Sequence, residues 1–219
     1  MGFDTILHFL EDLKENNNRD WFTINKNQFI TAKKEFEIQV EILIREIVKF
    51  DNDIGGLQAK DCIFRIYRDV RFSKDKSPYK TNFGAFMVPG GKKSGHAGYY
   101  IHIDPKSSFL AGGVHLPPSD ILKKIRLSIF EHTDEFKTIL NSPDFKKTFG
   151  NINGDKLKTA PKGFPKEFPD IDLIQFKSYT VVTEVSKSEL LRDNFLTQAA
   201  KTFKILSPYN QFLNHAINE

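Results

Sequence analysis

The segment "FGAFMVPGGKKSGHAGYYIHIDPKSSFLAGGV", residues 83–114, decides the fold. It contains three short runs of aromatic or β-branched residues, 83–88, 99–103 and 108–114, which are separated by links with Pro, Gly and Lys. Such runs are typical of strands, and "PGGKKSGHAG" (89–98) is typical of the long connection of a hairpin. Because links this short join antiparallel neighbours, the segment predicts a mostly antiparallel sheet.

Two further runs extend the predicted sheet. "CIFRIY" (62–67) precedes the segment, and "FKSYTVVTEV" (176–185) follows it after a long interval. Both alternate apolar and polar residues over a short length, as strands do. We therefore expect five strands in all.

Helical periodicity flanks the sheet on both sides. Residues 3–17 are amphipathic, and apolar residues from Phe29 to Phe50 recur every three or four positions, which predicts a helix of about six turns. Behind the sheet, helices are predicted to start at Ser119, at Ser142–Pro143, at the capping box of Ser186 and Glu189, and, as a last short helix, at Ser207–Pro208.

This order of elements predicts an α+β fold, in which a mostly antiparallel sheet packs with helices from both ends of the chain. We expect a single globular domain over residues 1–219, helical in 1–56, sheet-rich in 57–116, and helical with one strand in 117–219. Residues 151–175 contain Pro161, Pro165 and Pro169, so we expect an ordered loop there that packs through Phe164 and Phe168. Its lysines, 156, 158, 162 and 166, would add positive charge nearby.

The composition indicates a soluble protein of the cytoplasm. The chain has 219 residues, is 39% hydrophobic and includes 21 Phe, enough for a core without metals or disulfides. No apolar run approaches the roughly 20 residues of a membrane span. Cys62 is the single cysteine, which we expect to be a buried apolar side chain in a reducing compartment.

Positive charge is concentrated just before the predicted hairpin. The whole chain has a formal net charge of +4, and residues 60–80 alone hold seven Lys or Arg against three Asp. Arginine forks match phosphates and carboxylates in two bonds, and lysine adds a mobile charge. The cations predicted to bind an anion are Arg65, Arg68, Arg71, Lys74, Lys76 and Lys80, supported by Asp69, Asp75, Tyr67, Tyr79, Tyr100 and His102.

An alternative exists for each part of this site. The three arginines converge only if the chain turns near Arg68, and their neighbouring acids can instead pair with them on an ordinary surface, where each pair contributes about 0–1 kcal/mol. Tyr100, His102 and Asp104 share one face of a predicted strand, and with His115 they have some of the spacing of metal ligands. Without a Cys or Glu at ligand spacing we expect a polar sheet face and neither metal nor cofactor.

The charged run also resembles a known family signature. Its spacing is R-x-x-R-D-x-R-F-x-x-D-K-x-x-Y, carried by Arg65, Arg68, Asp69, Arg71, Phe72, Asp75, Lys76 and Tyr79. This is similar to the mostly bacterial family named domain of unknown function 2461, whose members have a similar length. "NNNRDWF" (16–22), the glycines 112–113 ahead of Pro117, and "APKGFP" (160–165) also resemble that family. The resemblance implies no activity and supplies no catalytic residue.

Three functional hypotheses follow. The first is a protein that binds a small phosphorylated or carboxylated molecule at the charged run, with or without catalysis. The second is a nucleic-acid-binding module, because arginines alternate with aromatic residues that can stack on bases. The third is a structural or protein-docking role, in which the run is an internal ion-pair network. The residues name no reaction and no oligomeric state.

Overall fold

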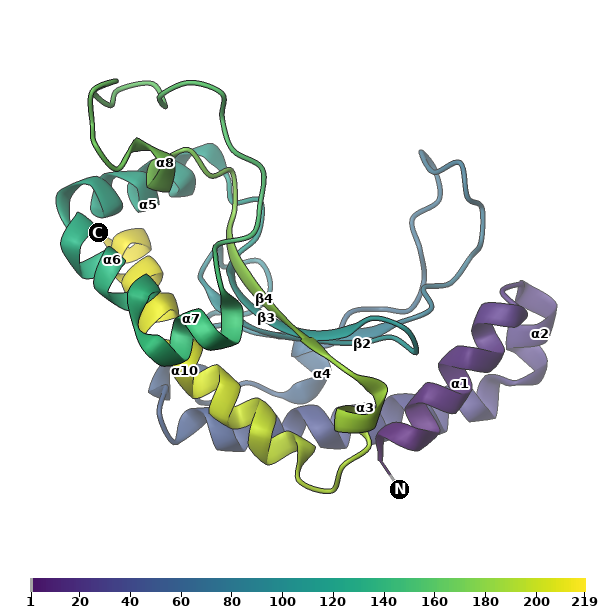
Figure 1. Cartoon of the computed structure of the whole chain (residues 1–219). Helices are drawn as coiled ribbons and strands as arrows, with labels where there is room; N and C mark the ends of the chain where they lie inside the picture. Colours follow the sequence, from purple (N-terminus) through teal and green to yellow (C-terminus); the bar gives the residue numbers. More distant parts are fainter. Residues whose placement is uncertain (1) are drawn as a thin grey trace.

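A four-stranded antiparallel sheet lies at the centre of the computed structural model, which describes residues 2–219 (Figure 1). The strands β1 (Phe83–Met87), β2 (Gly98–Ile103), β3 (Ser108–Val114) and β4 (Tyr179–Val185) are neighbours in chain order. The predicted α+β fold and mostly antiparallel sheet are confirmed. The hairpin between β1 and β2 also lies where "PGGKKSGHAG" predicts it.

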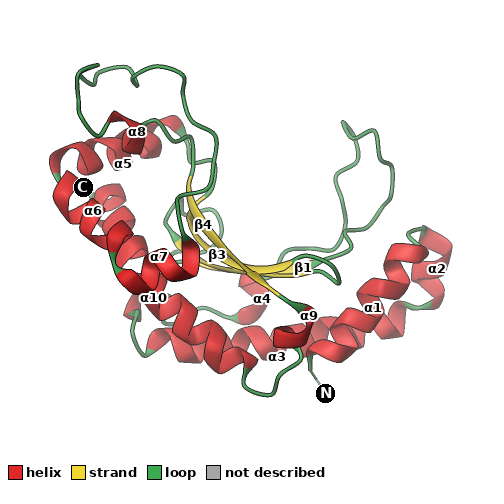
Figure 2. Ribbon diagram, viewed as in Figure 1, coloured by secondary structure: helices red, strands yellow, loops and turns green. Residues whose placement is uncertain are grey.

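One face of the sheet is covered by α3 (Lys26–Val48) and α10 (Phe195–Asn218), which lie below the strands in Figure 2. Strand alternation directs Phe83, Tyr99 and Val181 into this layer, where all three are buried. Phe83 stacks on Phe36 of α3 with ring centroids 5.4 Å apart. Within residues 2–219, no helix layer of this kind covers the other face of the sheet, which holds the candidate site (Figure 2).

The long helix predicted across residues 29–50 is present as α3, and shorter helices complete the structure. The stripe predicted along residues 29–50 is confirmed, because Ala32, Phe36, Val40, Leu43 and Ile47 of α3 are all buried. The other helices are α1 (Phe3–Glu15), α2 (Arg19–Ile24), η1 (Asn52–Ile54), α4 (Ala59–Cys62), α5 (Ser119–Glu131), α6 (Thr133–Asn141), α7 (Pro143–Phe149), α8 (Ile171–Ile174) and α9 (Lys187–Leu190).

The strand predicted over Cys62–Tyr67 is wrong. Cys62 ends the short helix α4, and only single bridges follow, between Ile63 and Ala85 and between Tyr67 and Tyr79. The chain touches the edge of β1, where the Phe64 amide donates to the Gly84 carbonyl, and then leaves the sheet. The apolar alternation therefore reflects packing at one sheet edge and not a fifth strand.

The last short helix predicted at Ser207–Pro208 is also wrong, because Pro208 lies inside the 24-residue helix α10. Proline removes one backbone hydrogen bond from a helix interior. Buried neighbours on both sides, Leu206, Tyr209 and Phe212, hold the helix against the core through this position. Tertiary packing thus overrides the local preference of proline for a helix start.

Residues 151–170 form an ordered loop, as expected, but the end of the predicted loop is the short helix α8. Asn153 pairs with Thr180 at the edge of β4, and the rings of Phe164 and Phe168 contact Phe130 edge to face. Lys156 lies over the Phe176 ring and 3.6 Å from Asp172. The charge of Lys156 is therefore paired with a nearby carboxylate, and its side chain packs on a nearby ring.

Three asparagines of α10 hold the end of the β1–β2 hairpin. Asn214 accepts from the Ala97 amide at 2.7 Å and donates to the Ala97 carbonyl at 3.1 Å. Asn210 donates to the Gly98 carbonyl at 3.0 Å, and the Asn218 oxygen lies 2.9 Å from His96 Nε2. Their spacing of four residues places all three on one helix face, which fixes the hairpin to α10.

Asn214→Ala should lower the free energy of unfolding by about 1–3 kcal/mol, because both backbone groups of Ala97 lose their partner. Urea unfolding of the variant and wild type measures this. Gln211→Ala is the matched control: Gln211 is exposed on the same helix, and its loss should cost less than about 0.5 kcal/mol. Equal midpoints for the two variants would contradict the role of Asn214.

Candidate functional site

A hollow of about 520 Å³ lies on the open face of the sheet. Each strand contributes to it, with Phe86 from β1, Tyr100 from β2, Phe109 from β3 and Val182 from β4. The register explains why these side chains meet, since Phe86 lies opposite Tyr100, Tyr100 opposite Ala111, and Ala111 opposite Val182. The full lining is Phe64, Lys80, Phe86, Tyr100, Phe109, Ala111, Gly112, Gly113, His115, Thr180 and Val182.

Part of the lining is bare backbone. A Cβ added at Gly112 would collide with the side chain of Leu206, and one added at Gly113 would meet the Tyr179 carbonyl and the Tyr209 ring. The direction at Gly112 is toward the covered face, and that at Gly113 is toward the backbone of β4. Gly112 and Gly113 therefore leave this stretch of β3 flat, so that a planar group has room to lie against it.

Residues 64–80, which we call the arm, rise from one end of the sheet on its open side (Figure 1). Two antiparallel backbone contacts define its base, from the Arg68 amide to the Pro78 carbonyl and from the Lys80 amide to the Ile66 carbonyl. Tyr79 is stacked on Phe22 of α2 with centroids 3.9 Å apart. These contacts fix the base of the arm beside the hollow.

The tip of the arm neutralises much of its own charge. Arg71 donates twice to Asp69, at 3.0 and 2.7 Å, and Arg68 pairs with Asp75. The hydrogen bonds from Arg71 lower the pKa of Asp69. Bonds from Ser77 and then from Arg68 lower the pKa of Asp75. The structure therefore does not gather Arg65, Arg68 and Arg71 around one hollow.

Most of the other arm residues predicted for the anion site do not line the hollow either. Lys76 donates to the Val70 carbonyl at 3.0 Å, and Lys74 is exposed at the tip. Tyr67 and Tyr79 pack against Phe22 and not in the hollow. Of the six predicted cations, Lys80 is the one that lines the hollow.

Lys80 forms the positive end of the hollow, and the charge of Arg65, which does not line the hollow, lies near it. Burial lowers the pKa of Lys80, and the charge of nearby Arg65 lowers it further. Within residues 2–219, no carboxylate lies within ion-pair distance of either side chain. A half-buried lysine beside a second cation, with no acid between them, is a place where a bound anion would be stabilised.

Lys92 was not identified from the sequence as a residue near the hollow. It belongs to the β1–β2 connection, yet its Nζ donates to the Ile63 carbonyl at 2.6 Å. Its Nζ lies 5.2 Å from the centroid of the Phe64 ring, and that of Lys80 lies 5.6 Å from the same centroid. These contacts add a further positive charge beside the Phe64 wall. No local signal in "PGGKKSG" indicates this contact across 29 positions.

The predicted pair Tyr100 and His102 lies on the open face of β2. The Tyr100 hydroxyl is 3.0 Å from His102 Nδ1, and the His102 ring stacks on Phe109 with centroids 4.5 Å apart. Burial lowers the pKa of His102 and raises the pKa of Tyr100 to about 12. Both side chains are therefore neutral at neutral pH. Residues 2–219 contain no group of three or more His, Cys, Asp or Glu able to hold a metal.

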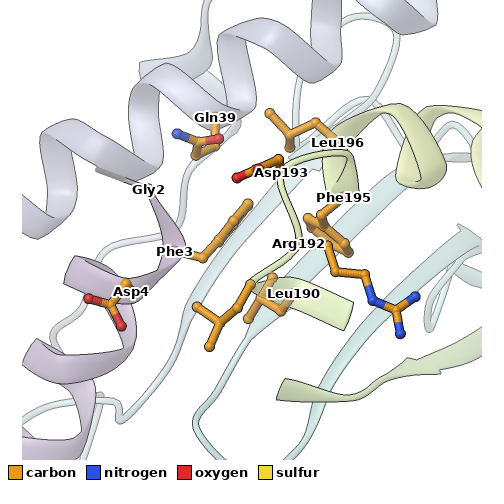
Figure 3. A pocket seen from close by; sticks show the side chains of 10 residues that line it. Gly2, Phe3, Asp4, Gln39, Leu190, Arg192, Asp193, Phe195 and Leu196 are labelled. Carbon is orange, nitrogen blue, oxygen red and sulfur yellow. The ribbon is translucent and has the colours of Figure 1, made fainter. Parts of the chain in front are cut away.

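A second hollow, shown in Figure 3, is less suited to an anion. It lies where the start of α1 meets the link between α9 and α10, and its charged lining includes Asp4 and Asp193. Its apolar wall is made by Phe3 and Phe195, whose rings meet edge to face at 5.1 Å. Asp4 and Asp193 outnumber Arg192, the one cation of this lining, so the net charge there is unfavourable to an anion.

Cys62 is buried, as expected. Burial raises the pKa of its thiol to about 11. The thiol is therefore protonated at neutral pH and is a poor nucleophile.

Among the helices of residues 2–219, none is long and apolar enough to span a membrane.

The chain belongs to an uncharacterised protein family. A family model described as "Conserved hypothetical protein (DUF2461)" matches residues 5–212, so the resemblance in the charged run is confirmed at the level of the family. No curated protein and no solved structure matches the chain. The family description assigns no activity, so function must be inferred from the site itself.

Proposed function

We propose that this protein binds a small organic molecule that carries a carboxylate or phosphate group. The acid group lies at Lys80 and Arg65, and the organic part lies in the hollow against Phe64, Phe86 and Phe109. The observation that carries the proposal is Lys80, a half-buried cation without an acid partner that lines an aromatic hollow and lies near the charge of Arg65. Apolar walls with a few converging polar groups are the usual composition of small-molecule sites.

This proposal narrows the site expected from the sequence. Arg68 and Arg71 already have carboxylate partners, so a ligand at the tip would compete with Asp75 and Asp69. Lys80 and Arg65 have no such competition. They also lie at the base of the arm, where a ligand can reach both charge and aromatic surface.

Lys80→Met should weaken binding of benzoate or phenyl phosphate about tenfold or more, because it removes a charged hydrogen-bond donor from a half-buried position. Isothermal titration calorimetry measures the affinity. Lys74→Met is the matched control, since Lys74 is exposed at the tip of the same arm and should leave affinity within about twofold. Unchanged affinity in both Lys80→Met and Arg65→Ala would refute the proposal.

The nucleic-acid alternative draws support from the tip of the arm. Phe72 is 96% exposed there, beside the guanidinium of Arg71, which lies 5.9 Å from its ring centroid. Exposed aromatic and basic side chains are the usual contacts for single strands. On this alternative, binding of an oligonucleotide falls steeply with salt and depends on Phe72 but not on Lys80. The structural alternative draws support from the Arg68–Asp75 and Arg71–Asp69 pairs.

A further inference from the structure

Tyr100, which lines the hollow, takes part in a directed hydrogen bond whose orientation restricts the ligand. Three side chains take part, with the Tyr100 hydroxyl 3.0 Å and the Asn82 amide nitrogen 3.4 Å from the same atom, His102 Nδ1. The amide nitrogen of asparagine is a donor only. His102 Nδ1 is therefore the acceptor in this cluster, and the proton of the neutral ring is on Nε2.

The direction of the Tyr100 bond follows. Since Nδ1 accepts, the Tyr100 hydroxyl donates its single proton to His102. The phenol keeps that proton at neutral pH, because burial holds the pKa of Tyr100 near 12. Toward the hollow, Tyr100 consequently presents oxygen lone pairs and no proton.

Neighbouring residues hold this arrangement. The His102 ring is stacked on Phe109 at an interplanar angle of 11°, which limits its rotation. Gly84 lies opposite His102 in β1, and a Cβ there would collide with the Tyr100 hydroxyl. Glycine at this position therefore leaves the space that the hydroxyl occupies, so the sheet itself fixes the position of the acceptor.

We propose that the ligand of the hollow is a ring-containing organic acid that also carries a hydroxyl or N–H group, which donates to the Tyr100 oxygen. This inference rests on the proposed function, because the acid group is taken to lie at Lys80 and Arg65. The ring lies between the aromatic walls and the bare backbone of Gly112 and Gly113. His102 is a positioning residue: it turns the Tyr100 proton away from the ligand.

The test compares benzoate with 3-hydroxybenzoate and 4-hydroxybenzoate by isothermal titration calorimetry at neutral pH. One hydroxylated isomer should bind wild type about fivefold more tightly than benzoate, the effect of one net hydrogen bond. Tyr100→Phe should abolish that preference, so that the affinities for benzoate and the hydroxylated isomer differ by less than about twofold, because the acceptor oxygen is lost and the ring remains. Retained benzoate binding also shows that the variant hollow is folded.

A second variant tests the positioning role. His102→Phe keeps a ring to stack on Phe109 but removes the acceptor, so the Tyr100 proton is free to turn into the hollow. A freed hydroxyl can still accept, but its direction is no longer fixed, so the preference for the hydroxylated isomer should fall to a value between those of wild type and Tyr100→Phe. A merely structural role for His102 would weaken benzoate and hydroxybenzoate alike and leave their ratio unchanged.

The outcomes separate the two proposals. Benzoate binding that depends on Lys80, with neither hydroxylated isomer preferred, overturns this inference and leaves the proposed function standing. A preference that survives Tyr100→Phe, or that His102→Phe leaves as large as in wild type, overturns it as well. No binding of any of the three acids overturns the proposed function and, with it, the inference.

Discussion

Gly113→Ala should lower the free energy of unfolding by about 3–5 kcal/mol. Gly113 has φ 95°, a conformation that side chains disfavour, and its added Cβ would collide with the Tyr179 carbonyl oxygen. That oxygen belongs to β4, which pairs with β3 along seven residues, so it cannot move aside cheaply. The two costs add, because one is local backbone strain and the other is displacement of a paired strand. Urea unfolding measures the loss.

Gly163→Ala separates these two costs. Gly163 has nearly the same φ, 93°, but a Cβ there meets nothing within 4 Å. It should cost only the backbone term, about 1–2 kcal/mol. Equal losses at the two positions would mean that the contact with β4 contributes nothing, which contradicts the packing described for β3.

The parts of the fold that were predictable are those set by local periodicity. The buried stripe of α3 and the runs of β1, β2 and β3 follow from spacing alone. The capping box of Ser186 and Glu189 is present as predicted. Each of these signals is decided within a few residues, so no tertiary contact needed to be known.

The errors arose where distant contacts decide the structure. Pro208 continues a helix because the core holds both sides of it, and "CIFRIY" leaves the sheet although its alternation fits a strand. The missed helices α2, α4, α6 and α8 are 4 to 9 residues long, too short for a strong periodic signal. In each case packing outweighed a weak local preference.

The candidate site was predicted in its charge but not in its shape. The sequence indicated that residues 60–80 carry the excess positive charge and that Tyr100 and His102 share a face. It did not indicate that Asp75 pairs with Arg68 or that Asp69 pairs with Arg71. These pairs depend on how the arm folds back on itself. The approach of Lys92 to Phe64 depends on the same tertiary arrangement. Which cations face the hollow is therefore a property of the fold.

Raising the pH above about 10 should remove stability, and three buried tyrosines alone should contribute about 4 kcal/mol per pH unit. Tyr99, Tyr179 and Tyr209 are fully buried, and burial raises the pKa of each above its usual value. The folded state keeps these three protons to a higher pH than the unfolded state does. Their contribution is complete below the unfolded pKa of about 10 and is lost as pH rises toward the folded values. Urea unfolding at a series of alkaline pH values measures the slope.

Tyr209→Phe tests whether the buried tyrosines cause this loss of stability with rising pH. Within residues 2–219 the Tyr209 hydroxyl is buried without a hydrogen-bond partner, so its removal should stabilise the protein at neutral pH by about 1 kcal/mol. It should also reduce the alkaline slope by about 1.4 kcal/mol per pH unit. Tyr179→Phe is the matched control: it should reduce the slope equally but lose about 1 kcal/mol at neutral pH, because the Tyr179 hydroxyl donates to the Leu173 carbonyl at 3.0 Å. A slope unchanged in both variants would show that other groups govern alkaline unfolding.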